Sequence, residues 1–233
     1  MLLFCIPHAG GSTLSYIKWK KYLNEGVTFM PLDLPGHITR REQPLCQNFY
    51  NALEDLYQCI RSAISDTEEP YAIFGHSLGA VFTYELYYKL DENGDRLPSS
   101  LFLSGRWPPY IEKKEDRRYK SFEEFKAGFI DSENLDKLSE ENKDLGDYFY
   151  QVIYTDLKLL DTYRVNPTPC RINSEMTIMW GSEDTSMSYA DVSAWGKAAG
   201  RSINFKMITG THMFPIINTI ETVNLINQVL TRY

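Results

Sequence analysis

Short apolar runs alternate with longer amphipathic segments along this chain. Runs typical of buried strands lie at residues 2–6, 27–32, 71–74, 100–104, 176–180 and 203–208. Segments with helical spacing of apolar residues lie at residues 14–23, 49–64, 189–199 and 216–230. Strands separated by helices predict an α/β fold with a mainly parallel sheet and helices on both faces.

This alternation stops between residues 110 and 169. The segment is rich in charged and aromatic residues, with helical patches at residues 122–129, 135–138 and 148–163 and no convincing strand. We interpret it as a helical lid insertion within a single domain that spans residues 1–233. Its aromatic residues either line a pocket or pack the insertion onto the core, and packing is the default.

Composition narrows the class of protein. The chain has 233 residues, of which 43% are hydrophobic and 24% charged, and a net charge of −7. These values are ordinary for a globular protein and argue against nucleic acid as a partner. No apolar run approaches the length of a membrane span, and no basic region precedes the apolar N-terminal residues. We therefore expect a cytoplasmic monomer that binds no membrane.

The four cysteines are far apart in the sequence and form no C-x-x-C pair: Cys5, Cys46, Cys59 and Cys170. Neither a zinc site nor a redox dithiol is indicated, so we expect reduced thiols. No metal-binding or nucleotide-binding motif is visible. We expect the protein to need no cofactor.

The residues Gly75-His76-Ser77-Leu78-Gly79 connect an apolar run to an apolar, helix-compatible segment. A G-x-S-x-G between a strand and a helix is typical of the nucleophile elbow, where a strained turn exposes the serine hydroxyl. Gly75 and Gly79 fit this interpretation because side chains there would collide where strand and helix cross. Ser77 is therefore the candidate nucleophile.

A serine hydroxyl needs a base, and in hydrolases with this elbow the base follows the serine in the chain. The sequence has four histidines, and only His212 lies downstream of Ser77. It follows the predicted strand 203–208, and catalytic groups gather at the carboxyl ends of parallel strands. A simple surface-loop histidine is the alternative. We predict that His212 is the base.

The third member, a carboxylate that orients the base, has several candidates. Asp184 follows the predicted strand 176–180 directly and is our choice. Glu183 is its nearest rival and Asp191 a weaker one. Asp156 and Asp161 lie in the insertion, and we interpret them as charges on a helix surface unless the insertion packs inward.

The turn at residues 7–12 follows the first predicted strand and is rich in glycine. Such a turn can present backbone N–H groups to an oxyanion, although a plain strand-to-helix turn would look similar.

With these motifs in place, the whole chain resembles the stand-alone type II thioesterases that accompany nonribosomal peptide and polyketide synthases and have the α/β-hydrolase fold. The matching stretches are PHAGGS at 7–12, LDLPGH at 32–37, FGHSLGA at 74–80, FLSGRWPP at 102–109, DLKLLDTYR at 156–164, WGSED at 180–184 and GTHMF at 210–214. The combination is more specific than the elbow alone.

The resemblance implies that Ser77, Asp184 and His212 form a catalytic triad and that the backbone N–H groups of Ala9 and Leu78 form the oxyanion hole. One departure concerns the loop after the L-P-G. Relatives often have an arginine and a glycine there, whereas this chain has His37, which puts a role of the loop at the entrance in doubt.

The implied activity is that of a serine thioesterase, which removes acyl groups from the phosphopantetheine arm of a carrier protein as an editing step. A medium-chain acyl-carrier-protein thioesterase of fatty acid synthesis and a general carboxylesterase are the catalytic alternatives. A non-catalytic binding protein on the same scaffold is the alternative from another class.

Carrier proteins of this kind are usually acidic, and residues 113–120 read KKEDRRYK. Lys113, Lys114, Arg117 and Arg118 are therefore candidates for docking the carrier. A solvated helix face is an equally good interpretation of these charges.

Overall fold

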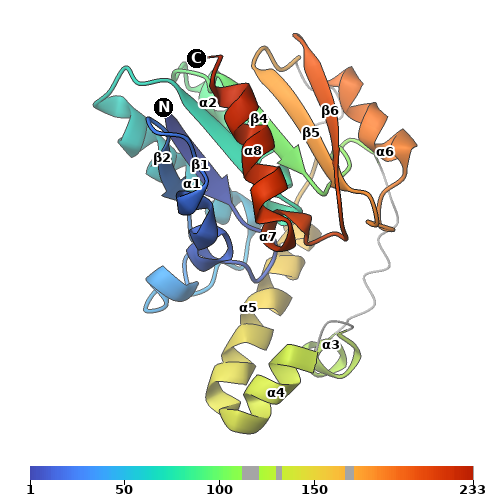
Figure 1. Cartoon of the computed structure of the whole chain (residues 1–233). Helices are drawn as coiled ribbons and strands as arrows, with labels where there is room; N and C mark the ends of the chain where they lie inside the picture. Colours follow the sequence, from blue (N-terminus) through green and yellow to red (C-terminus); the bar gives the residue numbers. More distant parts are fainter. Residues whose placement is uncertain (112–120, 130–132, 166–170, 233) are drawn as a thin grey trace.

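A parallel sheet of six strands forms the centre of the molecule, in the order β2-β1-β3-β4-β5-β6 (Figure 1). The computed structural model describes residues 1–111, 121–129, 133–165 and 171–232. The strands are β1 (Leu2–Ile6), β2 (Thr28–Pro31), β3 (Tyr71–His76), β4 (Ser100–Ser104), β5 (Glu175–Gly181) and β6 (Ile203–Ile208). Each overlaps one of the predicted apolar runs, so the predicted parallel sheet is confirmed.

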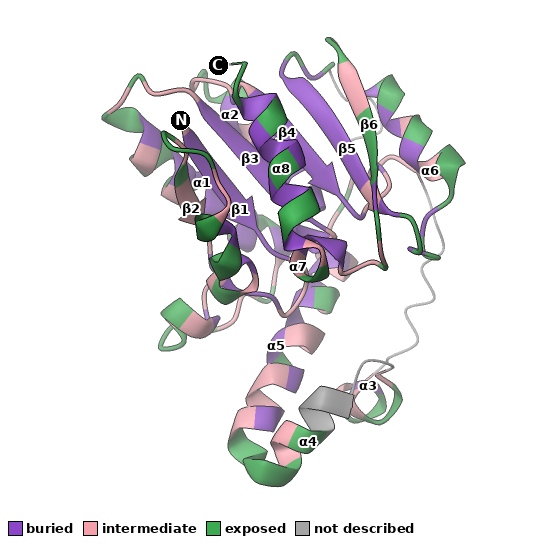
Figure 2. Ribbon diagram, in the orientation of Figure 1, coloured by how far each residue is buried: buried purple, intermediate pink, exposed green. Residues whose placement is uncertain are grey.

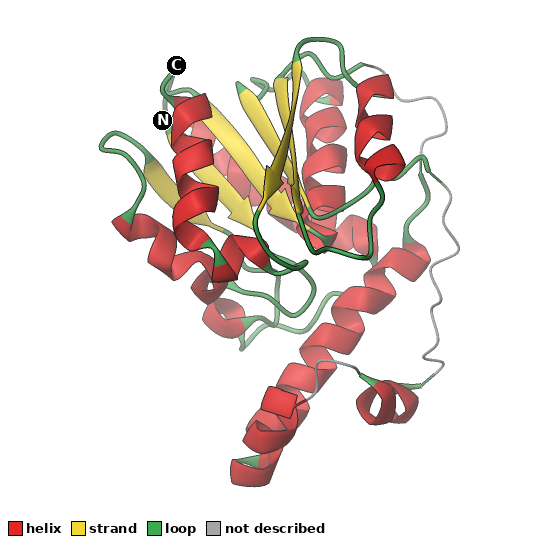
Figure 3. Ribbon diagram, turned by 45° about the vertical axis from the view of Figure 1, so that its right-hand side comes forward, coloured by secondary structure: helices red, strands yellow, loops and turns green. Residues whose placement is uncertain are grey.

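Helices cover both faces of the sheet, as Figure 3 shows. One face carries α1 (Phe49–Ser65), α2 (Leu78–Glu92), α6 (Tyr189–Ser193) and η3 (Ala194–Lys197), and the other carries η1 (Thr13–Lys21), α7 (Phe214–Ile217) and α8 (Thr219–Leu230). The period of two along a strand separates the two cores. Phe4 of β1 packs in the core shared with α1 and α2, whereas Leu3 and Cys5 pack in the core shared with η1 and α8.

The described parts of the segment between β4 and β5 contain three helices, as the sequence predicts: α3 (Phe122–Gly128), α4 (Glu133–Glu141) and α5 (Lys143–Thr162). Helix α5 extends away from the sheet, and α3 and α4 lie at its far end (Figure 1). Phe125 is buried, and its ring centroid lies 5.4 Å from that of Tyr154 and 6.2 Å from that of Tyr150. These aromatic residues pack α3 on α5. A lid function for the insertion stays a prediction.

The predicted closing helix is interrupted at Asn218. This residue has φ −102° and ψ 52°, outside the helical region, so the chain forms α7 and α8 instead of one continuous helix. The prediction of one continuous helix over residues 216–230 is therefore wrong. Ile217 is 67% exposed and Ile220 is 53% exposed.

The two edges of the sheet differ in exposure. β2 includes Pro31, which has no N–H to donate and is tolerated on an edge strand. At the other edge, β6 exposes three consecutive residues, Phe205, Lys206 and Met207 (Figure 2).

Cys5, Cys46 and Cys59 are free thiols, and Cys170 lies outside the described residues. Within the described ranges, no helix has the length and apolar character to cross a bilayer. The same ranges contain no group of three or more His, Cys, Asp or Glu side chains that could hold a metal ion.

Candidate active site

Ser77 occupies the turn between β3 and α2 with φ 54° and ψ −112°. Among the described residues it is the only one with a side chain at positive φ, a conformation that costs roughly 1–3 kcal/mol. The turn is held by Ser77 N–H, which donates to Ser104 O at 2.8 Å, and by Ala80 N–H, which donates to Ser77 O at 3.0 Å. The strained turn predicted for a nucleophile elbow is therefore confirmed.

The glycines on both sides of Ser77 allow the strand and the helix to cross closely. A Cβ atom on Gly75 would lie 2.1 Å from Gly79 O, and one on Gly79 would lie 2.2 Å from Ile6 O. Neither position has room for a side chain, as the sequence predicts. The second contact also places the start of α2 against the end of β1, so Leu78 lies close to the loop that follows Ile6.

Asp184 and His212 form a hydrogen bond of 2.7 Å, in which His212 Nδ1 donates to Asp184 Oδ2. They follow the neighbouring strands β5 and β6, and the two loops are joined by Glu183 N–H, which donates to Gly210 O at 2.8 Å. With its proton on Nδ1, the ring has its Nε2 lone pair available as a base. The structure thus brings Asp184 and His212 together, and their catalytic roles stay a prediction.

The carboxylate of Asp184 is buried and accepts several hydrogen bonds. Its Oδ1 accepts hydrogen bonds from Ser186 N–H at 3.0 Å and from Ser186 Oγ at 2.6 Å. Burial alone would raise the pKa of Asp184, but the hydrogen bonds from His212 and Ser186 hold it below its usual value. Asp184 therefore carries a negative charge at neutral pH, as an orienting acid requires.

Of the two rivals of Asp184, Asp191 has another role and Glu183 is exposed. Asp191 Oδ2 accepts from Ser188 N–H and Ser188 Oγ, both at 2.7 Å, and so caps the start of α6. The side chain of Glu183 is exposed.

His212 lies beside the elbow. Its ring centroid is 4.9 Å from that of His76, the residue before Ser77. Gly105 permits this approach, because a Cβ atom there would lie 2.4 Å from His76 Cε1 and 3.2 Å from His212 Cε1. Among the described residues no hydrogen bond joins Ser77 Oγ to His212, and such contacts often tighten only when substrate binds.

His76, the residue before Ser77, is buried and neutral. Burial lowers its pKa well below the usual value, and the nearby rings of His212 and His8 lower it further. Its Nδ1 lies 2.9 Å from Ser104 Oγ. His76 therefore adds no positive charge next to His212, which leaves that ring free to take up a proton.

The loop after β1 carries Ala9, the first predicted oxyanion donor. Leu78, the second, is the first residue of α2, where backbone N–H groups have no partner within the helix. Neither the Ala9 N–H nor the Leu78 N–H donates to another group in the described parts of the chain. Both donors are available for a negatively charged oxygen, and their role in an oxyanion hole stays a prediction.

The interpretation of Asp156 as a surface charge is wrong, because its side chain is buried and contacts the loop after β1. Asp156 Oδ2 accepts from Gly10 N–H at 2.7 Å, and Oδ1 lies 3.1 Å from His37 Nε2. His37, from the L-P-G-H loop, is 2% exposed. Sequence reasoning missed this pair. The available signal was helical spacing, since Asp156 shares a face of α5 with the buried residues Val152 and Leu159.

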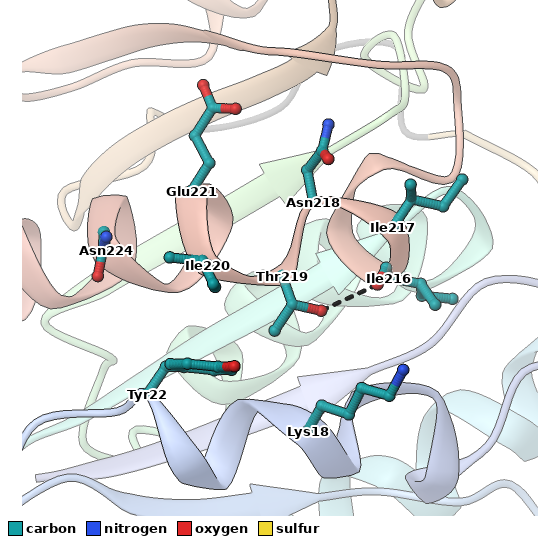
Figure 4. Close-up of a pocket in the computed structure, with 9 residues that line it drawn as sticks. All are labelled: Lys18, Tyr22, Ile216, Ile217, Asn218, Thr219, Ile220, Glu221 and Asn224. Carbon is teal, nitrogen blue, oxygen red and sulfur yellow. Dashed lines mark hydrogen bonds between the residues drawn. The ribbon is translucent and has the colours of Figure 1, made fainter.

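The predicted docking residues Lys113, Lys114, Arg117 and Arg118 lie outside the described residues. A hollow of about 610 Å³ lies between η1 and the helices α7 and α8, and Figure 4 shows nine of its lining residues. Its lining contains none of the predicted site residues. This hollow is therefore not the proposed reaction site.

The model of the thioesterase domain family matches residues 2–230. The chain belongs to this thioesterase family. Thioester hydrolysis is accordingly its activity, and the predicted resemblance to type II thioesterases is confirmed.

Two curated relatives are similar in sequence to most of this thioesterase. The gramicidin S biosynthesis protein GrsT of Aneurinibacillus migulanus is 25% identical over 216 residues, which cover 91% of this chain and 82% of the relative. The medium-chain S-acyl fatty acid synthase thioesterase of Homo sapiens is 25% identical over 218 residues, which cover 91% of this chain and 80% of the relative.

Among solved structures, ClbQ from the colibactin nonribosomal peptide and polyketide synthase pathway superposes with a TM-score of 0.84 at 27% identity. The match covers 99% of this thioesterase and 97% of ClbQ. The predicted α/β-hydrolase fold is confirmed.

Proposed function

We propose that this thioesterase hydrolyses acyl groups from the phosphopantetheine arm of a carrier protein, as an editing enzyme of a nonribosomal peptide or polyketide synthase. The hydrogen bond from His212 to Asp184, placed beside the strained Ser77, supports the hydrolytic chemistry. The similarity to GrsT and ClbQ supports the pathway class.

In the proposed first half-reaction, His212 Nε2 removes the proton of Ser77 Oγ as this oxygen attacks the thioester carbonyl carbon. Asp184 keeps the imidazole in the required tautomer and stabilises the imidazolium that forms. The N–H groups of Ala9 and Leu78 bind the carbonyl oxygen as it becomes negative. The C–S bond then breaks, and the imidazolium returns its proton to the departing thiolate.

A thiol leaves readily because its pKa of about 8.5 lies far below that of an alcohol. In the second half-reaction, His212 takes a proton from water, and the hydroxide attacks the acyl carbon bonded to Ser77 Oγ. The C–O bond to Ser77 breaks, the serine regains its proton from His212, and the free acid departs. The side chains of the triad return to their starting state.

The test is hydrolysis of a panel of acyl-loaded carrier proteins by the wild type and by Ser77→Ala. We expect turnover by the wild type and a loss of roughly 10³-fold or more in kcat for the variant, since removing a triad member leaves only residual catalysis. Acyl-pantetheine and simple esters of the same acyl group serve as competing substrates. A clear preference for simple esters would refute the thioesterase substrate.

Chain length distinguishes the alternative in fatty acid synthesis. A selective release of medium-chain acyl groups from the acyl carrier protein would favour a role like that named for the human relative. Broad acceptance of short acyl groups on peptidyl or polyketide carrier proteins would support the editing role.

A further inference from the structure

The buried ring of His37 lies between two hydrogen-bond acceptors. Its Nδ1 is 2.8 Å from Gly11 O, and its Nε2 is 3.1 Å from Asp156 Oδ1. A neutral imidazole has one N–H, so it could satisfy only one of these contacts. An imidazolium has two N–H groups and satisfies both. With Asp156 as a carboxylate that can only accept, the geometry therefore points to a proton on each nitrogen of His37.

Asp156 supplies the opposite charge and a further contact. Its Oδ1 faces His37, while its Oδ2 accepts from Gly10 N–H at 2.7 Å. The imidazolium and the carboxylate thus hold the peptide groups of two consecutive residues, by the N–H of Gly10 and by the C=O of Gly11. Both charged side chains are almost fully buried, with exposures of 2% for His37 and 2% for Asp156.

This ionic pair contacts the two residues that follow Ala9, the predicted oxyanion donor. Gly10 follows Ala9, has φ +75°, and lies so close to α5 that a Cβ atom on it would be 2.1 Å from Ile153 Cγ1. A turn within the loop adds one hydrogen bond, from Gly11 N–H to His8 O at 2.9 Å. The long-range polar contacts that fix the loop on α5 therefore come from His37 and Asp156.

We propose that His37 and Asp156 are positioning residues, an imidazolium–carboxylate pair that holds the Ala9–Gly11 loop in the geometry needed for the oxyanion. This inference rests on the proposed function, because it assigns the loop a part in thioester hydrolysis. Neither side chain contacts the reacting atoms. They act through the position of the Ala9 N–H.

The surroundings leave His37 as the titrating member of this cluster near neutral pH. Burial lowers the pKa of His8 to about 4, and the charges of His212 and His37 act in the same direction. Burial raises the pKa values of Tyr148 on α5 and of Cys46. Asp33, after β2, accepts hydrogen bonds from the backbone N–H groups of Thr13 and Thr39 and from the Thr39 hydroxyl.

The direction of the pH dependence follows from the same contacts. Burial alone would lower the pKa of His37, but its hydrogen bond to Asp156 and the charge of that carboxylate raise it above the usual 6.5. The charge of His37 therefore stabilises the pair at pH values below its ordinary pKa of 6.5, and this effect is lost as pH rises through the higher pKa of His37 in the fold. Loss of the proton leaves one ring nitrogen facing an acceptor without a hydrogen.

The pH profile of the activity should reflect the protonation of His37. His37 must be charged to hold the loop, which gives the profile a falling limb at higher pH. The falling limb would thus belong to a residue outside the triad.

The experiment compares the pH profile of kcat for the wild type, Asp156→Asn and the control Asp161→Asn, with an acyl-pantetheine thioester as substrate. The amide of Asp156→Asn can accept from Gly10 N–H and donate to a neutral His37 ring, so we expect the falling limb to disappear. Asp161 lies on the same helix and pairs with Lys158 at 2.6 Å, and its variant should keep the falling limb.

A spectroscopic measurement on the wild type needs no variant. Long-range ¹H–¹⁵N spectra of the histidine rings should show both nitrogens of His37 protonated at pH 6, with a titration midpoint above 6.5. A His37 ring with a single N–H at pH 6, or an unchanged falling limb in Asp156→Asn, would overturn the inference. Absence of thioester hydrolysis by the wild type, with His37 doubly protonated, would instead refute the proposed function and this use of the loop.

Discussion

The close crossing of β3 and α2 predicts that Gly75→Ala damages both stability and activity. The new Cβ atom would lie 2.1 Å from Gly79 O and 2.3 Å from Thr83 Oγ1. Ordinary contacts of this kind exceed 3.4 Å, so α2 must move by roughly 1 Å relative to β3. Gly79 O belongs to the backbone of a buried helix and cannot rotate away.

Overpacking of this kind costs about 1–3 kcal/mol. For a chain of this size, each 1 kcal/mol lowers the melting temperature by about 2–4 °C, so we expect a loss of about 2–12 °C. Because Ser77 lies between the two elements, a shift of about 1 Å in its position should also lower kcat by roughly 10²-fold. Thermal unfolding followed by circular dichroism and kcat with an acyl-pantetheine thioester measure the two effects.

The matched control is Gly196→Ala, because a methyl group added at Gly196 would have no neighbour within 4 Å and the residue has no positive φ. We expect a change within about 0.5 kcal/mol and an unaltered kcat. Adding Thr83→Ala to Gly75→Ala should restore little of the lost melting temperature or kcat, since the contact with Gly79 O remains. A Gly75→Ala protein with wild-type melting temperature and kcat would show that the crossing can relax, and would refute this reasoning.

Three further substitutions probe the acid–base pair and the packing of η1. Asp184→Asn should lower kcat by about 10⁴-fold at pH 7. The pKa of Asp184 is lowered in the fold, so its carboxylate stabilises the protein above the unfolded pKa of about 3.9. This stabilisation is lost as pH falls through the pKa of the folded state. The acid unfolding of the Asp184→Asn variant should therefore be less steep. Ser186→Ala removes the hydroxyl donor to Asp184 Oδ1 but keeps the backbone N–H donor, and it should lower kcat several-fold without changing KM; an equal change in both would contradict this role. Trp19→Phe removes the bond from Trp19 Nε1 to Pro215 O at 3.0 Å and should cost about 1–3 kcal/mol in urea unfolding, whereas an unchanged midpoint would mean that the carbonyl finds another donor.

The sequence predicted best those features that depend on neighbouring residues. The elbow around Ser77 could be recognised because its glycines, its strand and its helix are contiguous. The pairing of Asp184 with His212 followed from a general rule, since consecutive parallel strands end at one edge and bring their loops together.

Features that depend on the packing of distant segments were missed. Nothing near Asp156 in the sequence specifies that its partner is His37, 119 residues away along the chain. Likewise, the apolar spacing of residues 216–230 continues through Asn218, although the backbone leaves the helical region there. Periodicity identifies a buried face but does not identify what a polar residue on that face will contact.

The uncovered strand β6 has a consequence for behaviour in concentrated solution. Its outer side has no neighbouring strand in the sheet, and it exposes Phe205 and Met207. Lys206 lies between them, and antiparallel pairing of two molecules centred on this residue would bring two ammonium groups together. One cation therefore opposes the growth of an intermolecular sheet at this edge, and removing the charge of Lys206 should favour such pairing.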